Sequence, residues 1–274
     1  MKRIFVIVLA LVALSVIVFA IWLTNGIVNN RKLFEAIENN DSSSAKEAVE
    51  DGAFVNMRMR SIFLRELVPT NPTPLVQACR NGNEEIILLL LENGADVNKQ
   101  DNYTGNTPLL AAAAGRKENR FRLARMLIEE GADIHISTVT NSVFMTSLFV
   151  SNYDSPDTVC EGYDFFLYLM GEHADMSIVF GNENALTYAA HYQNENAVRY
   201  LIEHRYFEIN SRDDNQDTAL IVAAKNDHIG VVRLLLELGA DAEVKSREGK
   251  TAYDYAVGNE NSAMVSLLME ASSS

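Results

Sequence analysis

The chain has 274 residues and carries a formal net charge of −14 at pH 7. Such an acidic chain is poorly suited to binding nucleic acids, because phosphates are bound by lysine and arginine. Its acidity is consistent with attraction of a basic protein or simply with solubility, and the composition leaves both interpretations open.

The chain opens with an apolar segment that runs from Ile4 to Leu23. About twenty apolar residues make a membrane-spanning helix, and Trp22 stands where an interfacial aromatic residue is expected. A cleaved signal peptide is the alternative, but its apolar region is usually about 7–15 residues long. The residues around Ala20 also form a poor cleavage site. We therefore predict that residues 1–30 are a transmembrane anchor or an uncleaved signal.

The positive charges near this segment indicate its orientation. Lys2 and Arg3 precede it directly, whereas Arg31 and Lys32 follow it at a distance. The positive-inside rule then places the N-terminus in the cytosol and residues 31–274 on the other side, which in a bacterium is the periplasm or the cell surface. Cleavage would instead leave a secreted or periplasmic protein.

Two short motifs recur along the rest of the chain, and several neighbouring copies of one of them, Thr-Pro-Leu with its variants, lie 33 or 34 residues apart. A fixed period of this size indicates one small supersecondary unit stacked several times. The Gly-Ala-Asp motif begins at Gly94, Gly131 and Gly239. The Thr-Pro-Leu motif begins at Thr73 and Thr107, and modified copies begin at Asn184, Thr218 and Thr251.

The motifs have a physical interpretation as the start and end of short helices. The Thr107 hydroxyl can cap a helix, and Pro108 suits its first turn because a missing N–H costs nothing there. The alanines that follow give a thin helix that a neighbour can approach closely. Gly131 favours the left-handed conformation that ends the second helix of the unit.

With these motifs the chain resembles the ankyrin-repeat family over about residues 31–270, and we expect a bacterial member. The resemblance implies an all-α fold, a solenoid of about seven helix-turn-helix units preceded by one N-terminal hydrophobic helix. The units are expected at about residues 31–56, 72–98, 101–135, 136–177, 182–210, 214–243 and from 249 onward. In the fourth unit, helices are expected at residues 142–150 and 165–170.

The resemblance also implies a binding surface made of turn tips and first helices. Tyr103 and Phe180 should contribute most, because aromatic residues dominate binding hot spots. An insertion at residues 57–71 either adds Phe63 and Arg65 to this surface or folds back over the first unit. Carried over by position, the remaining surface residues are Asn102, Asn106, Asn182, Asp214, Gln216, Arg247 and Lys250.

The sequence contains no motif of the common enzyme classes, such as a nucleophile elbow, a phosphate-binding loop or a zinc-protease helix. We predict no catalytic, cofactor or metal site and no small-molecule substrate. Cys79 is expected in the core and Cys160 in the long loop of residues 151–162. These two cysteines are too distant for a disulfide, and Cys160 would be the first candidate for a hidden enzyme.

The function we predict is a non-catalytic protein–protein binding module that faces the cell envelope. Some ankyrin-repeat proteins of bacterial envelopes are immunity proteins, so the resemblance makes neutralisation of a basic toxin or effector the specific hypothesis. The alternative is a membrane-anchored scaffold or stress-response adaptor with several weak partners.

Overall fold

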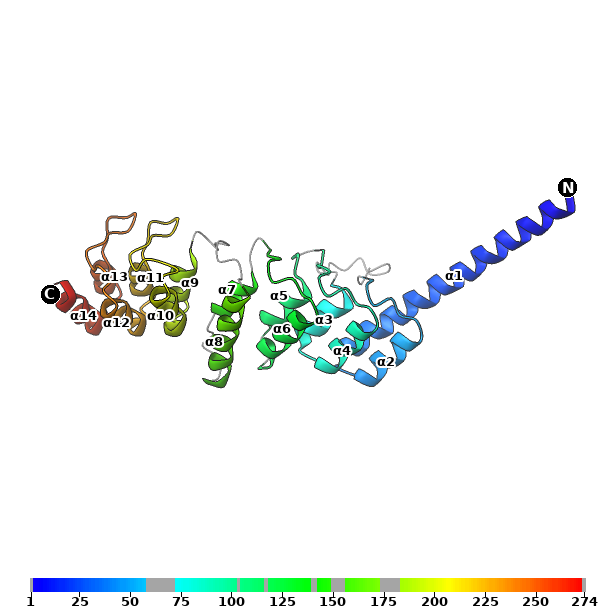
Figure 1. The fold of residues 1–274 in the computed structure, drawn as a ribbon, viewed down its shortest axis with the longest axis horizontal. Helices are drawn as coiled ribbons and strands as arrows, with labels where there is room; N and C mark the ends of the chain where they lie inside the picture. The colour runs from blue at the N-terminus through cyan, green and yellow to red at the C-terminus, as the bar shows by residue number, and fades with distance from the viewer. Residues whose placement is uncertain are drawn as a thin grey trace. The chain divides into compact units, whose positions relative to one another are not determined.

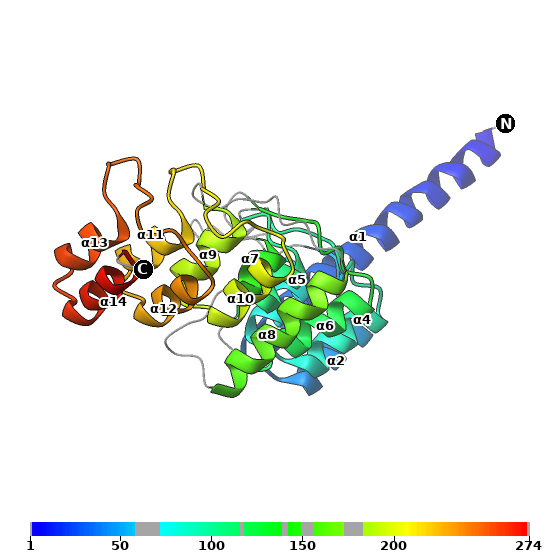
Figure 2. The same ribbon diagram turned by 60° about the vertical axis from the view of Figure 1, so that its left-hand side comes forward.

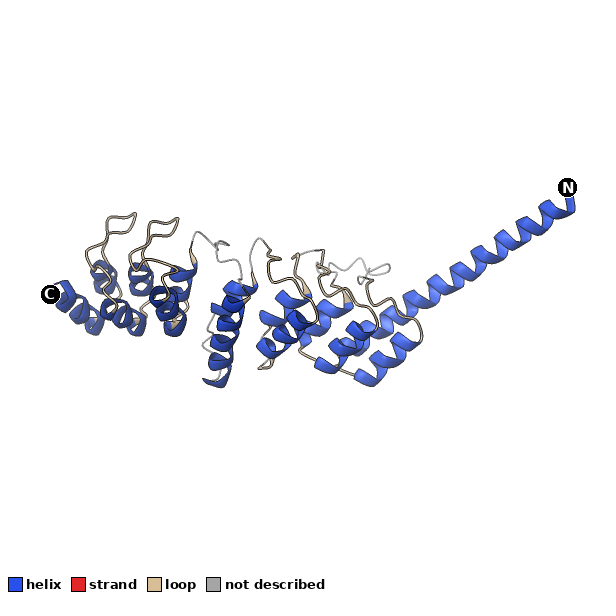
Figure 3. Ribbon diagram, viewed as in Figure 1, coloured by secondary structure: helices blue, strands red, loops and turns tan. Residues whose placement is uncertain are grey.

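The structure is a computed structural model that describes residues 2–57, 72–102, 104–115, 118–138, 142–148, 156–172 and 183–272. For residues 2–10 and 156–161 it describes the backbone alone. The described chain is helical, with an isolated β-bridge between Arg212 and Thr218 (Figure 3). It divides into two compact units, Met1–Asp133 and Ile134–Ser274.

Consecutive helices form antiparallel pairs in both units (Figure 1). The first unit holds α1 (Lys2–Glu38), α2 (Ser42–Glu50), α3 (Pro74–Asn81), α4 (Glu84–Glu92), α5 (Pro108–Ala113) and α6 (Arg120–Glu129). The second holds α7 (Val143–Leu148), α8 (Pro156–Gly171), α9 (Ala185–His191), α10 (Glu195–Glu203), α11 (Ala219–Lys225), α12 (Ile229–Glu237), α13 (Ala252–Gly258) and α14 (Ser262–Ser272). The described residues thus contain seven helix pairs, and the predicted all-α repeat fold is confirmed.

The recurring motifs occupy the helix ends, as their chemistry predicts. The Thr73 and Thr107 side chains accept hydrogen bonds from the Val76 and Leu110 amides, and a proline follows each threonine in the first turn. Gly131 has a φ of 90°, a left-handed conformation that a side chain would strain. The alanines of α5 are fully buried, so the neighbouring first helix packs closely against them.

Asparagine side chains join successive repeats in the first unit. The Asn98 side chain donates a hydrogen bond to the Gly131 carbonyl at 3.2 Å and accepts one from the Asp133 amide at 2.8 Å. Asn56 makes the same two contacts one repeat earlier, with Gly94 and Asp96. These bonds satisfy backbone groups that a short helix pair leaves without partners.

The fourth repeat differs from the prediction. Its second helix, α8, begins at Pro156 instead of residue 165, so Cys160 lies in a helix. The loop predicted at residues 151–162 is therefore wrong for residues 156–162, and residues 151–155 lie outside the described residues. The physical reason is that proline favours the first turn of a helix, where its missing N–H costs no hydrogen bond. Phe166 of α8 then packs against Phe144 of α7, with ring centroids 5.9 Å apart.

Helix α1 continues without a break from the apolar segment into the first repeat (Figures 1 and 2). Leu33, Phe34 and Ile37 near its C-terminal end are almost completely buried and serve as the first helix of that repeat. The helix segment Leu11–Glu38 is long and apolar enough to cross a membrane, a test of length and composition that a signal sequence near the N-terminus also meets. Between Leu11 and Leu23 its large apolar side chains are exposed.

Candidate protein-binding surface

Three loops that precede a first helix close in the same way. In each, the first residue of the loop donates its backbone N–H to the carbonyl of the residue just before the helix cap, which shapes the loop into a finger (Figure 2). The three pairs are Asp101–Asn106, Asp213–Asp217 and Ser246–Lys250, at 2.9, 3.0 and 2.8 Å.

The side chain of the first residue holds the finger from inside. Asp213 Oδ1 accepts hydrogen bonds from the amides of Asn215 and Asp217, both at 2.9 Å. Asp101 Oδ1 does the same with the third and fourth residues after it, at 2.7 and 3.0 Å. A carboxylate oxygen that accepts two amides favours this tight conformation.

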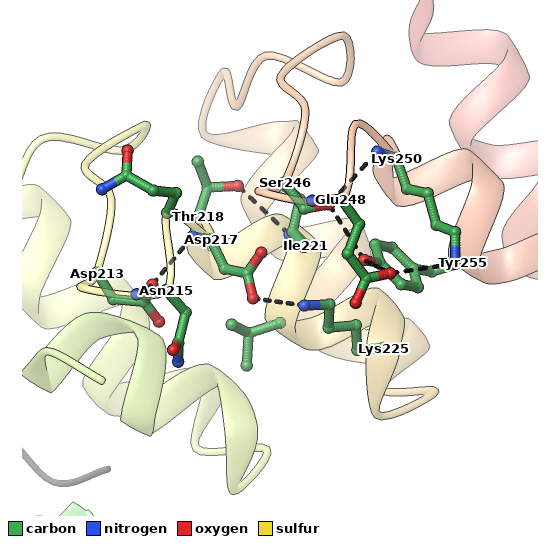
Figure 4. Close-up of polar contacts among 12 residues, drawn as sticks. Asp213, Asn215, Asp217, Thr218, Ile221, Lys225, Ser246, Glu248, Lys250 and Tyr255 are labelled. Atoms are coloured by element: carbon green, nitrogen blue, oxygen red, sulfur yellow. Dashed lines mark hydrogen bonds and ion pairs between the residues drawn. The ribbon is translucent and has the colours of Figure 1, made fainter. Parts of the chain in front are cut away.

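Charged groups from two fingers meet at Lys225, which lies on the first helix α11 (Figure 4). Lys225 Nζ lies 2.5 Å from Asp217 Oδ2 and 4.9 Å from the centroid of the Tyr255 ring on α13. Burial opposes the charge on Lys225, but the hydrogen bond and the charge of Asp217 outweigh it, so the pKa of Lys225 is raised. The ammonium group therefore stays charged at neutral pH.

Tyr255 connects Lys225 to the next finger. Its hydroxyl lies 3.1 Å from Ser246 Oγ and donates to Glu248 Oε2 at 3.3 Å. Glu248 in turn forms an ion pair with Lys250 at 3.2 Å, which holds the pKa of this carboxyl below its ordinary value. We call Asp217, Lys225, Glu248, Lys250 and Tyr255 the finger cluster; it presents both signs of charge and one aromatic ring.

The preceding repeat carries a similar acid–base pair in the same register. Glu183 stands just before the helix cap, as Asp217 does, and His191 stands seven residues after the cap, as Lys225 does. The two side chains are 2.7 Å apart. Burial raises the pKa of Glu183, although the hydrogen bond to His191 works in the opposite direction.

The first unit uses the equivalent basic position differently. Arg80 lies seven residues after its cap, and its guanidinium contacts Asp101 of the next finger at 2.7 Å. The Asp101 side chain is fully buried and also accepts a hydrogen bond from the Thr104 hydroxyl. Arg80 thus holds the finger before α5 in place.

The predicted surface residues fall into three groups. Asn102, Asp214, Gln216 and Arg247 are exposed on fingers, and Asn106 is half-buried. Lys250 is exposed and joins the finger cluster. Five others lie outside the described residues, namely Phe63, Arg65, Tyr103, Phe180 and Asn182.

The prediction missed Asp217, Lys225 and Tyr255, although the sequence contained a usable signal. Acid and base are separated by eight residues across a helix cap at Asp217 and Lys225, and Glu183 and His191 repeat that spacing. The spacing places the acid just before the N-cap and the base at the last residue of the helix, and in both repeats the two side chains are in contact.

The described residues offer no group of three His, Cys, Asp or Glu side chains that could hold a metal ion. Cys79 lies in α3 and is 2% exposed, as predicted for a core residue. Burial raises the pKa of its thiol well above the ordinary range, so the reactive thiolate is disfavoured.

Solved structures share the fold of this chain. The human ASB11 ankyrin repeat domain aligns with a TM-score of 0.68 and 23% identity, over 87% of this chain and 96% of that one. A structure of the predatory endopeptidase Bd0816 from Bdellovibrio bacteriovorus in complex with immunity protein Bd3460 contains a chain that aligns with a TM-score of 0.58 and 22% identity. That alignment covers 72% of this chain and 96% of that one.

Two curated relatives are much longer than this chain. The ankyrin repeat and KH domain-containing protein mask-1 of Caenorhabditis elegans is 24% identical over 233 residues, which make up 74% of this chain and 8% of that protein. Alpha-latrocrustotoxin-Lt1a of Latrodectus tredecimguttatus is 26% identical over 68% of this chain and 10% of its own length. This chain therefore spans only a small part of either relative.

A family model described as ankyrin repeats (3 copies) matches residues 33–138, 158–246 and 207–274. These matches cover most of the chain and include both compact units. The chain therefore belongs to the ankyrin-repeat family, whose repeats are protein–protein interaction modules.

Proposed function

We propose that this chain is a membrane-anchored binding module that captures a basic protein outside the cytosol, and that this partner is a toxic effector. The proposal rests on one observation, which is that a single chain contains both an exposed apolar helix and acidic ankyrin repeats. The helix would hold the repeats at the envelope. The repeats would bind the effector there before it reaches its target.

The net charge of −14 supports a basic partner, because opposite charge speeds association and disfavours acidic competitors. The finger cluster suits such a partner at closer range. It offers Glu248 and the part-exposed Tyr255 ring, and an aromatic ring beside charged groups is a common interface anchor. The adjacent finger adds the exposed carboxylate of Asp214.

The immunity role is the most specific part of the proposal. The likeness to a chain in the endopeptidase–immunity complex is one of fold alone, so it offers a precedent for the scaffold and no assignment. Charge and the apolar helix support the role more directly. A scaffold with several weak partners is the competing outcome.

Binding and protection are tested together in a cell that produces, as the candidate toxin, the product of the gene beside this one. We expect the full chain to restore growth and to form a one-to-one complex with that protein in mild detergent. A Glu248→Lys, Asp214→Lys double variant should weaken the complex, while a Glu129→Lys, Glu130→Lys double variant at the exposed C-terminal end of α6 serves as the charge-matched control. Growth arrest despite full production of the chain would rule out the immunity role.

The membrane topology has its own test. A reporter that is active only outside the cytosol, fused after residue 274, should be active, and the chain should stay in the membrane after carbonate extraction. A reporter active only in the cytosol would reverse the proposed orientation. Release by carbonate would show that residues 4–23 do not anchor the chain.

A further inference from the structure

The junction between the apolar part of α1 and the first repeat is built without a flexible linker. The loop after α2 folds back along α1, and the Phe54 ring contacts the Trp22 indole edge-on with centroids 4.8 Å apart. Phe54 also lies against Gly26, where an added Cβ atom would overlap its ring. Gly26 is therefore a contact surface for Phe54 as well as a helical residue.

Two buried asparagines fix this loop to the helix. The Asn29 side chain donates a hydrogen bond to the Asp51 carbonyl at 2.6 Å, and the Asn30 side chain accepts one from the Phe54 amide. Asn29 and Asn30 are 8% and 6% exposed, although they lie on a helix whose preceding turns are exposed. Lys32 adds an exposed ion pair with Asp51 at 3.7 Å. The loop thus makes polar and apolar contacts with α1 over more than two turns.

The position of Trp22 indicates how deep this junction lies relative to the bilayer. The apolar run from Ile4 to Leu23 would extend about 30 Å as a helix, which is about the thickness of the hydrocarbon core. Trp22 lies at the end of that run and is 56% exposed. Indole rings at such ends favour the interfacial layer. Since Phe54 contacts Trp22, it must lie in the same layer.

We infer that the first repeat rests on the membrane surface, where Trp22 and Phe54 together occupy the interfacial layer of a phospholipid bilayer. This inference rests on the membrane anchoring proposed above. The glycerol and carbonyl region of the lipids would then contact the loop after α2. The direction of α1 would then set the angle between the first repeat and the bilayer surface. A partner that binds the first repeat would have to bind close to the bilayer.

The test exploits the fact that Trp22 is the only tryptophan in the chain. In a Trp22→Phe background, Phe54→Trp moves the fluorophore into the loop. The full chain is placed in phosphatidylcholine nanodiscs whose lipids carry bromine near the headgroup or near the chain end. We expect the emission of Trp at position 54 to be blue-shifted and to be quenched more by the shallow bromine than by the deep one.

A matched control places tryptophan at the equivalent turn two repeats later. Asp133→Trp in the same background follows Gly131 and Ala132 as Phe54 follows Gly52 and Ala53, and Asp133 is exposed. Its emission should be that of a water-exposed indole, without quenching by either lipid. Equal emission and quenching at positions 54 and 133 would overturn the inference.

A second measurement needs no substitution in the loop. Lipids with a spin-labelled headgroup should broaden the amide resonances of Ala53 and Phe54 in the wild-type chain and leave those of Ala132 and Asp133 unchanged. Sharp Phe54 resonances in a chain that resists carbonate extraction would contradict contact of the first repeat with the bilayer. They would not contradict membrane anchoring by α1. A chain lost from the nanodisc would reject the anchor itself.

Discussion

The finger before α5 and the finger before α11 have the same backbone design but treat their first aspartate differently. Asp101 is fully satisfied, because amides, the Thr104 hydroxyl and the Arg80 guanidinium surround it. Asp213 is 5% exposed and its Oδ2 has no hydrogen-bond partner among the described residues. The same loop therefore stabilises the first unit and carries an electrostatic cost in the second.

The basic position in the preceding helix explains the difference. Arg80 reaches forward to Asp101, whereas His191, in the equivalent position, contacts Glu183 of its own repeat. The side chain of histidine is shorter than that of arginine and reaches less far from its helix. Asp213 is left near Asp217, and burial together with that negative charge raises the pKa of the Asp213 carboxyl. The position of an aspartate within the repeat therefore does not decide by itself whether that aspartate stabilises the fold.

The largest effect is expected from Asp101→Asn. The substitution removes the charge that faces Arg80 and turns an amide donor toward it, so the free energy of unfolding should fall by about 2–3 kcal/mol. Urea unfolding measures the loss, and amide exchange at Thr104 and Gly105 should accelerate. Glu92→Gln, an exposed charge loss in the same unit, should change little. A stability equal to wild type would mean that Arg80 does not stabilise this finger.

The same substitution in the other finger should have the opposite sign. Asp213→Asn keeps an oxygen for the Asn215 and Asp217 amides and removes a buried charge, so we expect a gain of up to about 1 kcal/mol at pH 7. Urea unfolding at pH 7 checks the gain. Asp214→Asn removes the neighbouring exposed charge and is the matched control. A loss of stability at Asp213 would remove the contrast between the two fingers.

The pH dependence sharpens this contrast. A carboxyl whose folded pKa is raised binds more protons in the folded state, so the free energy of unfolding falls as pH rises above the ordinary value of 3.8 for Asp213. Glu183 acts in the same direction above 4.5, and Lys225 partly offsets the charge near Asp213. Between pH 4 and pH 7 the wild type should therefore lose more stability than the Asp213→Asn variant. Parallel curves would contradict this assignment.

The period near 33 residues and the helix caps predicted the repeat fold, because both depend on local chemistry. Thr107, Pro108 and Gly131 each have the role that their residue type favours. The continuity of α1 was also readable in principle, since residues 24–30 contain no proline and Gly26 is the sole weak point. The predicted boundary at residue 30, between the apolar segment and the repeats, falls inside α1, so the two parts share one helix.

The loop contacts could not be predicted, because they depend on side-chain reach between repeats. The sequence places Arg80 and His191 in the same register, and only three-dimensional distances show that one reaches the next finger. The start of α8 was missed for a simpler reason, since Pro156 reads equally well as a loop residue or as a first helical turn. The local sequence does not distinguish a proline in a loop from a proline in the first turn of a helix.

Transplanting the first finger's arrangement into the second should give a smaller effect. His191→Arg supplies a guanidinium in the position of Arg80, and we expect about 0.5–1 kcal/mol of added stability from its contact with Asp213. Urea unfolding compares it with His191→Gln, which removes the imidazole and adds no charge. The gain should vanish in the Asp213→Asn background. A gain that persists there would come from Glu183 instead.

The smallest effect is expected at the link between the two fingers of the second unit. Tyr255→Phe removes the hydroxyl that contacts Ser246 and Glu248 but leaves the ring beside Lys225. Since Ser246 keeps its amide donors from residues 248 and 250, we expect a loss of about 0.5 kcal/mol in unfolding free energy. Tyr253→Phe, a more exposed tyrosine on the same helix, is the control. A loss no larger than that of the control would show that the Tyr255 hydroxyl does not hold the two fingers together.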